Sequence, residues 1–250
     1  YLQNTSGSTR LPAGVMISHR NLRANYEQLC PDYFSQFGGA VPPETSLVSW
    51  LPFYHDMGLM LGIAFPIFVG RHADLMSPLG FLARPARWMH ALSRHEKAFS
   101  AAPNFAFDLT ARRITDDEMV GLDLSGVIGI INGAERIHPA TLARFNKRFA
   151  DVGFRPEMML PSYGLAEATV YVASGSAGRT PEVVEFDADQ LTENIAVRSP
   201  GGTPLLRYGV PDSPVVLIVD PDTCRPCPDG TVGEIWVHGE NVAAGYWRKP

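Results

Sequence analysis

Residues 5–9 of the chain are a short run of hydroxyl side chains around a glycine, Thr5-Ser6-Gly7-Ser8-Thr9. Hydroxyls and backbone N–H groups are donors for phosphate oxygens, and a glycine lets the backbone approach closely. The run is not a Walker A loop, because Gly-x4-Gly-Lys-Ser/Thr does not occur in the chain. An ordinary Ser/Thr/Gly turn explains the same residues, so anion binding and a plain turn both stand as interpretations of this run.

A second stretch, SWLPFYHDMGLM at 49–60, places His55 and Asp56 at the start of a predicted helix beside several aromatic residues. Imidazole is a donor near neutral pH and can face a carboxylate or a phosphoryl group. Asp56 also suits a helix cap, so a structural role explains this pair when it is taken alone.

Two further stretches, INGAERIHP at 131–139 and LPSYGLAEATVY at 160–171, follow predicted strands. Ligands bind in open α/β sheets at the carboxyl ends of the strands. Tyr163 and Gly164 suit stacking on a flat ring with close backbone approach. Glu167 suits a magnesium ion shared with substrate phosphates. A tight turn and a surface carboxylate are the structural alternatives.

These residues must be positioned by elements that alternate between strand and helix through about residue 175. The strand patterns cover 15–18, 46–51, 73–75, 98–101, 126–131 and 169–173. The helix patterns cover 21–33, with Asn21 as its cap, and 57–68, 85–93, 105–113 and 139–149. This alternation predicts an α/β fold in which helices are layered on a mostly parallel sheet.

The pattern changes near residue 178, which predicts two partial units at 1–178 and 179–250. Residues 180–207 are polar and rich in Gly and Pro, and we expect an irregular insertion there. Strand patterns return at 215–219 and 233–238, around a turn, so we expect a small β-rich subdomain after the insertion.

Composition narrows the class of protein. With 250 residues, 45% hydrophobic and 19% charged, the chain is typical of a globular protein, and a net charge of −5 argues against a nucleic-acid binder. Three cysteines do not form a disulfide framework, and Cys224 and Cys227 lack a matching second pair for zinc. The apolar run 57–69 is too short to span a membrane. We expect a cytoplasmic or membrane-associated protein.

Taken in order, these stretches resemble the adenylate-forming enzymes, which include acyl-CoA synthetases, peptide-synthetase adenylation domains and luciferases. TSGSTRLPAGV is similar to their phosphate loop and FYHDMG to their next core motif. NGAE and YGLAEAT are similar to the adenine and magnesium motifs, and GEIWVHGENVAAGYW to the motif that follows. The resemblance covers nearly the whole chain, and five ordered motifs are far more specific than any one of them.

Longer stretches resemble long-chain fatty acyl-AMP ligases, especially the mycobacterial ones that feed polyketide synthases. They include LVSWLPFYHDMGL, RPARWMHALSRH, FSAAPNFAFDL and PSYGLAEATVYVA. Residues 180–207 look like the insertion of that group, which implies a restrained C-terminal lid and transfer to an acyl carrier protein instead of coenzyme A. Ala13 replaces the usual lysine of the phosphate loop, with Arg10 as the nearby cation, and this feature is shared by that group. Ala166 replaces a common threonine.

The resemblance implies activation of a long-chain fatty acid by ATP and Mg²⁺ to an acyl-adenylate, with release of pyrophosphate. The acceptor it implies is an acyl carrier protein domain of a polyketide synthase. The implied phosphate-binding residues are Thr5, Ser6, Gly7, Ser8 and Thr9, and the implied adenine-binding residues are Gly133, Ala134, Glu135, Ser162, Tyr163 and Gly164. The implied catalytic residues are His55 and Glu167, with Glu167 also ligating the metal, and the acyl-binding candidates are Trp50, Phe53, Met57, Phe105 and Phe107.

Three alternatives stay open at this level. Plain core packing explains Trp50 and Phe107 as well as an acyl tunnel does, because tunnels and cores share a composition. A long-chain acyl-CoA synthetase is the nearest rival function. The third is a nucleotide- or acyl-binding piece that is inactive in isolation. The ribose-binding Asp and the lid domain with its catalytic Lys are expected beyond Pro250, and an earlier part of the domain before Tyr1.

Overall fold

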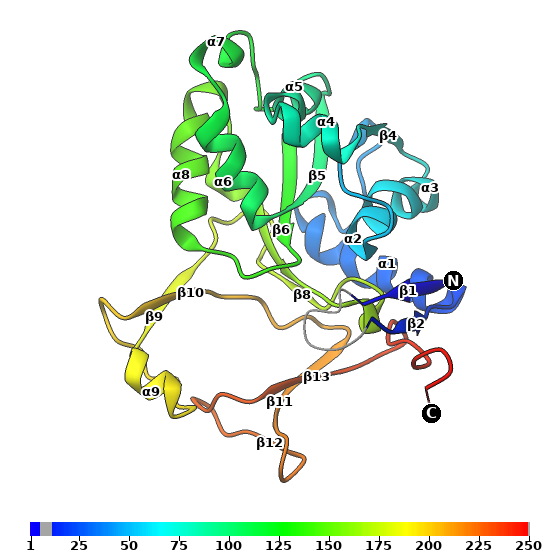
Figure 1. Cartoon of the computed structure of the whole chain (residues 1–250), viewed down its shortest axis with the longest axis vertical. Helices are drawn as coiled ribbons and strands as arrows, with labels where there is room; N and C mark the ends of the chain where they lie inside the picture. The colour runs from blue at the N-terminus through cyan, green and yellow to red at the C-terminus, as the bar shows by residue number, and fades with distance from the viewer. Residues whose placement is uncertain (6–11, 250) are drawn as a thin grey trace.

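The computed structural model describes residues 1–5 and 12–249, and its centre is a six-stranded sheet (Figure 1). The spatial order is β4-β3-β5-β6-β7-β8, in which all neighbours run parallel except β7 and β8. The strands are β3 (Thr45–Ser49), β4 (His72–Leu75), β5 (Lys97–Pro103), β6 (Val127–Gly133), β7 (Met159–Tyr163) and β8 (Ala173–Ser174). The predicted α/β class with a mostly parallel sheet is confirmed.

Helices connect these strands, as parallel pairing requires. The longer ones are α1 (His19–Tyr33), α4 (Pro78–Ala83), α5 (Ala86–Ser93), α6 (Asn104–Arg113) and α8 (Pro139–Phe149). The shorter ones are α2 (Asp56–Leu59), α3 (Phe65–Val69) and α7 (Asp116–Met119), together with several 3₁₀ turns. Within the described residues, none of the helices has the length and apolar character needed to cross a membrane.

Neighbouring residues of a strand point to opposite faces of the sheet, and helices cover both of these faces. On β5, Phe99 packs on Phe34 after α1, with ring centroids 4.8 Å apart. The next residue, Ser100, accepts a hydrogen bond of 3.0 Å from Trp88 Nε1 of α5. Figure 1 shows α6 and α8 on one side of the sheet and α1 and α3 on the other. The result is three layers, with the sheet in the middle.

Helix α1 begins earlier than predicted. Its cap is Ser18, whose hydroxyl accepts from the backbone N–H of Asn21 at 3.1 Å. The side chain of Asn21 in turn accepts from the backbone N–H of Ser18 at 2.9 Å, so the two residues form a reciprocal capping box. The prediction that Asn21 is the cap was wrong, because the first hydroxyl of the Ser-His-Arg-Asn run already satisfies the free N–H groups.

The predicted helix over 57–68 is present in three joined parts. A π-helical segment, η2 (Met60–Ala64), lies between α2 and α3. Gly62 lies against the sheet in this segment, where an added Cβ would be 3.0 Å from Ser49 Oγ. Helix α4 was not predicted, although Ser77 caps it by accepting from the N–H of Gly80 at 3.0 Å.

The strand predicted over 169–173 was wrong. Residues Ala166–Ala168 form a 3₁₀ turn, Thr169 has a φ of 71°, and only Ala173–Ser174 pair with β7. The β-branched residues suggested a strand, but a strand cannot include a residue in this conformation.

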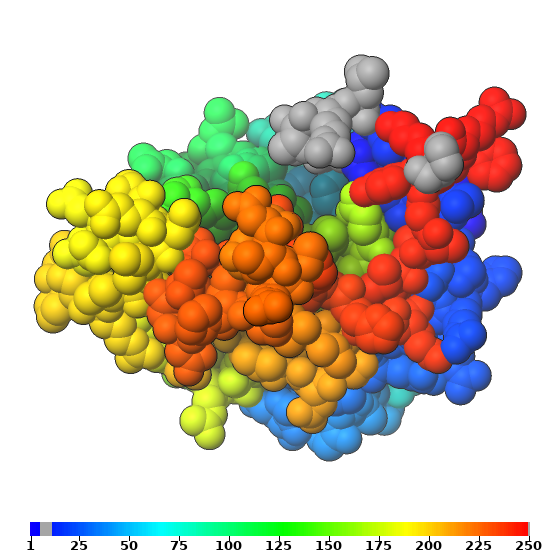
Figure 2. Space-filling model, turned by 90° about the horizontal axis from the view of Figure 1, so that it is seen from below, coloured from blue at the N-terminus to red at the C-terminus, as the bar shows by residue number. Residues whose placement is uncertain are grey.

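The second half of the chain is mostly β structure. Residues 180–207 are not irregular as predicted, since β9 (Val183–Phe186) pairs with β10 (Thr203–Leu206) around helix α9 (Ala188–Thr192). The strands predicted at 215–219 and 233–238 are confirmed as β11 (Val215–Asp220) and β13 (Glu234–His238), with β12 (Arg225–Pro226) on the other edge of β11. Figure 2 shows these elements covering one face of the molecule. The boundary near residue 179 stays a prediction.

The two ends of the described chain meet. Strand β1 (Leu2–Asn4) pairs with β2 (Gly14–Met16), and residues 245–247 then pair with β2 from its other side. The N–H of Trp247 donates to the carbonyl of Gly14 at 2.7 Å, and the N–H of Met16 to the carbonyl of Gly245 at 2.9 Å. Figures 1 and 2 show both ends together beside β1 and β2.

A substitution at Phe107 separates core packing from contact with an acyl chain. Phe107 is fully buried on α6 and packs on Trp88 and Phe145, with ring centroids 5.5 and 5.1 Å away. In the full-length protein, Phe107→Ala should lower the free energy of unfolding by about 3–5 kcal/mol, because it leaves a cavity in a packed layer. Urea unfolding measures this loss. A stability loss below about 1 kcal/mol, with a changed preference for acyl chain length, would contradict the core interpretation.

Candidate functional site

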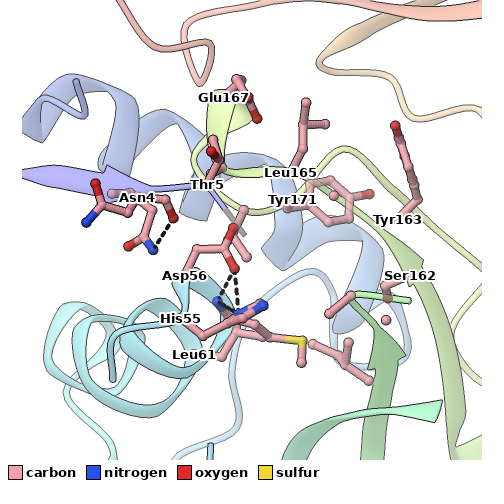
Figure 3. A pocket seen from close by; sticks show the side chains of 18 of the residues that line it. Asn4, Thr5, His55, Asp56, Leu61, Ser162, Tyr163, Leu165, Glu167 and Tyr171 are labelled. Atoms are coloured by element: carbon pink, nitrogen blue, oxygen red, sulfur yellow. Dashed lines mark hydrogen bonds and ion pairs between the residues drawn. The ribbon is translucent and has the colours of Figure 1, made fainter. Parts of the chain in front are cut away.

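A cavity of about 1030 Å³ opens at the carboxyl ends of β6 and β7 (Figure 3). Its wall combines the end of β1, Ala13 just before β2, the start of α2, the inner side of α1 and the loop after β7. The predicted site residues on this wall are Thr5, His55, Met57, Gly133, Ala134, Ser162, Tyr163, Gly164 and Glu167. Segments that are more than a hundred residues apart in sequence therefore converge at the edge of the sheet where ligands bind in this fold class.

The base of the predicted phosphate loop is closed by two hydrogen bonds. Thr5 donates its backbone N–H to the carbonyl of Ala13 at 3.0 Å, and the N–H of Ala13 donates to Thr5 Oγ1 at 3.0 Å. The predicted residues Ser6, Gly7, Ser8 and Thr9 lie outside the described residues. Thr5 and Ala13 both face the cavity, so the ends of the loop are anchored at its rim.

His55 is the cap of α2, and Asp56 is the first residue of that helix. The carboxylate Oδ1 of Asp56 lies 2.8 Å from His55 Nδ1 and accepts the N–H of Met57 at 2.6 Å. The hydrogen bond that the His55 imidazole donates to the carboxylate of Asp56 raises the pKa of His55 above its usual value, although partial burial opposes the shift. This arrangement favours a protonated imidazole on the cavity wall.

The segments predicted to bind adenine lie on neighbouring strands. Gly133 ends β6 beside Ser162 of β7, and an added Cβ at Gly133 would lie 2.9 Å from the carbonyl oxygen of Ser162. Ser162 accepts from Tyr33 of α1 at 3.1 Å. Glu135 is not on the cavity wall. Its carboxylate accepts the N–H of Phe105 at 2.6 Å, next to the start of α6.

The loop that carries Glu167 folds back on itself. Gly164 is packed so closely that a Cβ there would lie 1.6 Å from the carbonyl oxygen of Val170. Glu167 Oε1 accepts the hydroxyl of Tyr246 at 2.7 Å, and the carbonyl of Glu167 accepts the N–H of Ala243 at 2.8 Å. Figure 3 draws Glu167 at the top of the cavity beside Thr5, with Asp56 and His55 below.

The five predicted acyl-binding residues lie in different parts of the structure. Met57 lines the cavity, whereas Trp50, Phe53, Phe105 and Phe107 do not. Trp50 is buried and stacks on Phe81 with ring centroids 3.8 Å apart, and Phe107 lies in the core. Phe53 and Phe105 are about half exposed. The predicted group of five is therefore divided between the cavity, the core and the surface.

A magnesium ion fits this cavity only as an ion shared with a ligand. Within residues 1–5 and 12–249 there is no group of three or more His, Cys, Asp or Glu side chains that could hold a metal by themselves. Glu167 and Asp56 are carboxylates on the wall, and Asp56 is already in contact with His55. Mg²⁺ commonly takes one or two protein carboxylates and completes its shell with phosphates and water, so this donor set suits such an ion.

Several wall residues were missed by the sequence analysis, among them Asn4, Tyr54, Tyr171, Tyr246 and Lys249. Tyr246 and Lys249 reach the cavity only because residues 245–247 pair with β2. No local pattern signals that long-range pairing. Tyr171 was within a motif but was assigned to a strand. Cys224 and Cys227 do not line the cavity.

Comparisons with known proteins agree with this arrangement. A family model described as AMP-binding enzyme matches residues 1–247. FadD21 of Mycobacterium tuberculosis (strain ATCC 25618 / H37Rv), whose name describes a fatty-acid–CoA ligase, is 62% identical over 100% of this chain and 44% of its own length. FadD28 of the same strain, named a long-chain-fatty-acid–AMP ligase, is 58% identical over 100% of this chain and 43% of its own length.

A solved structure is similar over the same extent. It is that of the fatty acyl-adenylate ligase from Legionella pneumophila in complex with acyl adenylate and pyrophosphate. That protein is 40% identical with a TM-score of 0.91, and the match covers 100% of this chain and 43% of that one. The chain thus spans less than half the length of these relatives.

The contact between His55 and Asp56 predicts a pH-dependent effect. Because the pKa of His55 is raised in the folded protein, its contribution to stability is complete below the unfolded pKa of about 6.5 and is lost as pH rises through the folded value. In the full-length protein, Asp56→Asn should lower the pKa of His55. It should also reduce the free energy of unfolding more at about pH 5.5 than at about pH 8.5.

An NMR titration of the histidine Cε1 protons measures the first effect, and urea unfolding at the two pH values measures the second. Asp117→Asn, which removes an exposed carboxylate on α7, is the control. A His55 titration unchanged by Asp56→Asn would contradict the assignment of the raised pKa to this carboxylate.

Proposed function

We propose that the full-length protein activates a long-chain fatty acid with ATP, because this chain belongs to the family of AMP-binding enzymes. The products are a fatty acyl-adenylate and pyrophosphate. The observation that carries this proposal is the convergence of Thr5, Gly133, Tyr163 and Glu167 on one cavity at the carboxyl ends of β6 and β7. The names of FadD28 and of the L. pneumophila protein support the choice of fatty acyl-adenylate as product.

The reaction is an in-line displacement at the α-phosphate. A carboxylate oxygen of the fatty acid forms the new bond to phosphorus, the bond between the α-phosphorus and the bridging oxygen breaks, and pyrophosphate leaves with that oxygen. The protein contributes positioning and charge stabilisation, because the displacement requires no covalent bond to a side chain. We assign the hydroxyl donors of Thr5, Ser6, Ser8 and Thr9 to the departing phosphates.

Glu167 is the candidate metal ligand. When bound, Mg²⁺ would neutralise negative charge on the phosphates. Glu167 would hold that ion from the rim of the cavity, where Thr5 also lies. The hydroxyl of Tyr246 donates to the same carboxylate and restricts its orientation.

We assign the opposite side of the cavity to the nucleotide base and the junction with the acyl group. Gly133, Ala134 and Gly164 line this side of the cavity, where the two glycines let the backbone pack closely on Ser162 and Val170. We assign Tyr163, on the same wall, to stacking on the base. His55, with its raised pKa, is a donor for the oxygens at the carboxylate–phosphate junction. Glu135, which contacts the start of α6, supports the shape of this segment from outside the wall.

We propose that the acyl chain enters past Met57, which lines the cavity together with Leu61. Trp50, Phe53, Phe105 and Phe107 contact the acyl chain only if it extends beyond this cavity. Trp50 and Phe107 already have aromatic partners, so we expect their main contribution to be packing.

For the next step we propose transfer of the acyl group to a carrier protein domain of a polyketide synthase. The paired strands β9 and β10 form the segment that resembles the insertion of fatty acyl-AMP ligases. This segment would restrain a C-terminal lid and thereby disfavour coenzyme A as acceptor. A coenzyme A ligase is the second candidate function, because the name of FadD21 describes one at 62% identity.

Product analysis of the full-length protein tests these proposals. Wild type is incubated with dodecanoate, Mg-ATP and coenzyme A, and the acyl products are identified by mass spectrometry. We expect acyl-adenylate without acyl-CoA. Glu167→Gln should reduce the rate by about 100-fold or more, because it removes a charge that acts on the transferring phosphate.

The matched control is Glu27→Gln, which removes an exposed carboxylate of α1 that pairs only with Arg23 in the described structure. Its rate should stay within about twofold of wild type, as for most exposed ion pairs. Acyl-CoA as the main product would favour the ligase named for FadD21. Absence of both products with every fatty acid tested would contradict adenylate formation itself.

A further inference from the structure

The loop that carries Glu167 contains a turn that its own residues do not favour. Thr169 has φ 71° and ψ −60°, and the N–H of Val170 donates to the carbonyl of Ala168 at 2.9 Å. These values describe the rare form of the γ-turn, which is strained for a residue with a branched Cβ. Thr169 is also fully buried. A buried, strained turn persists only where surrounding contacts determine it.

One set of contacts comes from α1. Asn25 is fully buried, its Oδ1 accepts the N–H of Tyr171 at 3.1 Å, and its Nδ2 donates to the carbonyl of Tyr171 at 3.0 Å. Asn25 thus binds both backbone groups of one residue. Asp32 lies two turns further along the same face of α1 and accepts the hydroxyl of Tyr171. All the polar groups of Tyr171 are therefore bonded to this helix.

The other set comes from Asn241, in the segment after β13. Its side chain is fully buried, and Nδ2 donates to the carbonyl oxygens of Ala168 and Tyr171 at 3.2 and 3.3 Å. The hydroxyl of Thr169 donates to the carbonyl of Asn241 at 2.7 Å. Gln28 of α1 donates to Asn241 Oδ1 at 3.3 Å, which joins the two sets.

We infer that Asn25 and Asn241 are positioning residues that hold the turn at 167–171 so that Glu167 faces the phosphate side of the cavity. This inference rests on the role proposed above for Glu167. Because α1 follows β2, and β2 carries the closing end of the phosphate loop, one rigid helix fixes the position of Glu167 relative to Thr5 and Ala13.

The carbonyl of Glu167 itself accepts the N–H of Ala243, two residues after Asn241. The carbonyl of Glu167 and the backbone that follows it are thus bonded to groups outside the loop. Removal of Asn25 takes away the acceptor of the buried N–H of Tyr171, and removal of Asn241 takes one of two donors from each of the carbonyls of Ala168 and Tyr171. The strained turn is then less well held and relaxes. The carboxylate would lose its fixed direction while the rest of the sheet stays folded.

The test compares Asn25→Ala and Asn241→Ala in the full-length protein by hydrogen–deuterium exchange and by kinetics. We expect exchange in peptides covering residues 163–174 to become at least tenfold faster. We expect kcat for acyl-adenylate formation to fall at least tenfold and the Mg²⁺ concentration for half-maximal rate to rise. KM for the fatty acid should change less than twofold, because Met57 is not touched.

Phe145→Leu is the control for lost stability, since Phe145 is buried on α8 among aromatic rings and does not line the cavity. It should lower Tm without faster exchange at 163–174 and without the change in Mg²⁺ dependence. Gln28→Ala, at a partly exposed position, is a milder variant should the asparagine variants fail to fold. It should produce smaller changes in the same direction.

Hydrogen–deuterium exchange tests whether the asparagines hold the turn, and the kinetics test whether the turn positions Glu167. Unchanged exchange at 163–174, or changes equal to those of Phe145→Leu, would overturn the positioning role. Faster exchange with an unchanged kcat and Mg²⁺ dependence would also overturn it. If wild type forms no acyl-adenylate, the proposed function fails, and the exchange rates alone then decide whether the two asparagines hold the turn.

Discussion

The parallel pairing of β6 with β7 is the constraint on which the cavity depends. Ile130, Ile131 and Asn132 pair with Met159, Leu160 and Pro161 in register, so both strands end at the same edge of the sheet. This register places Gly133 against the carbonyl of Ser162, at a distance that leaves no room for a side chain. Both strand ends therefore contribute to one part of the cavity wall, at the edge of the sheet where ligands bind in this fold class.

The two faces of the sheet have different roles. Phe107, Phe145 and their aromatic neighbours fill the layer on one face and stabilise the fold. On the other face, α1 contributes Tyr33 to the cavity wall and Asn25 to the turn behind it. Buried polar side chains are costly unless all their groups are bonded, so Asn25 acts both as a structural contact and as a geometric restraint on the loop.

Two predictions depended on local composition or local preference alone. Trp50 and Phe107 were candidates for acyl contact because an apolar tunnel and an apolar core have the same composition, and only burial against Phe81 and Trp88 separates these uses. The strand predicted at 169–173 followed from its β-branched residues. Long-range bonds from Asn25 and Asn241 stabilise a turn there, and such bonds override a local preference of this size.

The sequence by itself determined the α/β class, the order of most strands and helices, and the short motifs that reach the cavity, because these depend on hydrophobic period and on residue type at turns. The tertiary structure alone decided which of those motifs face one another and which stay outside, as Glu135 does. It also brought Tyr246 and Lys249 to the rim by pairing residues 245–247 with β2. The physical reason is that backbone hydrogen bonds between distant strands carry almost no signature in the local sequence.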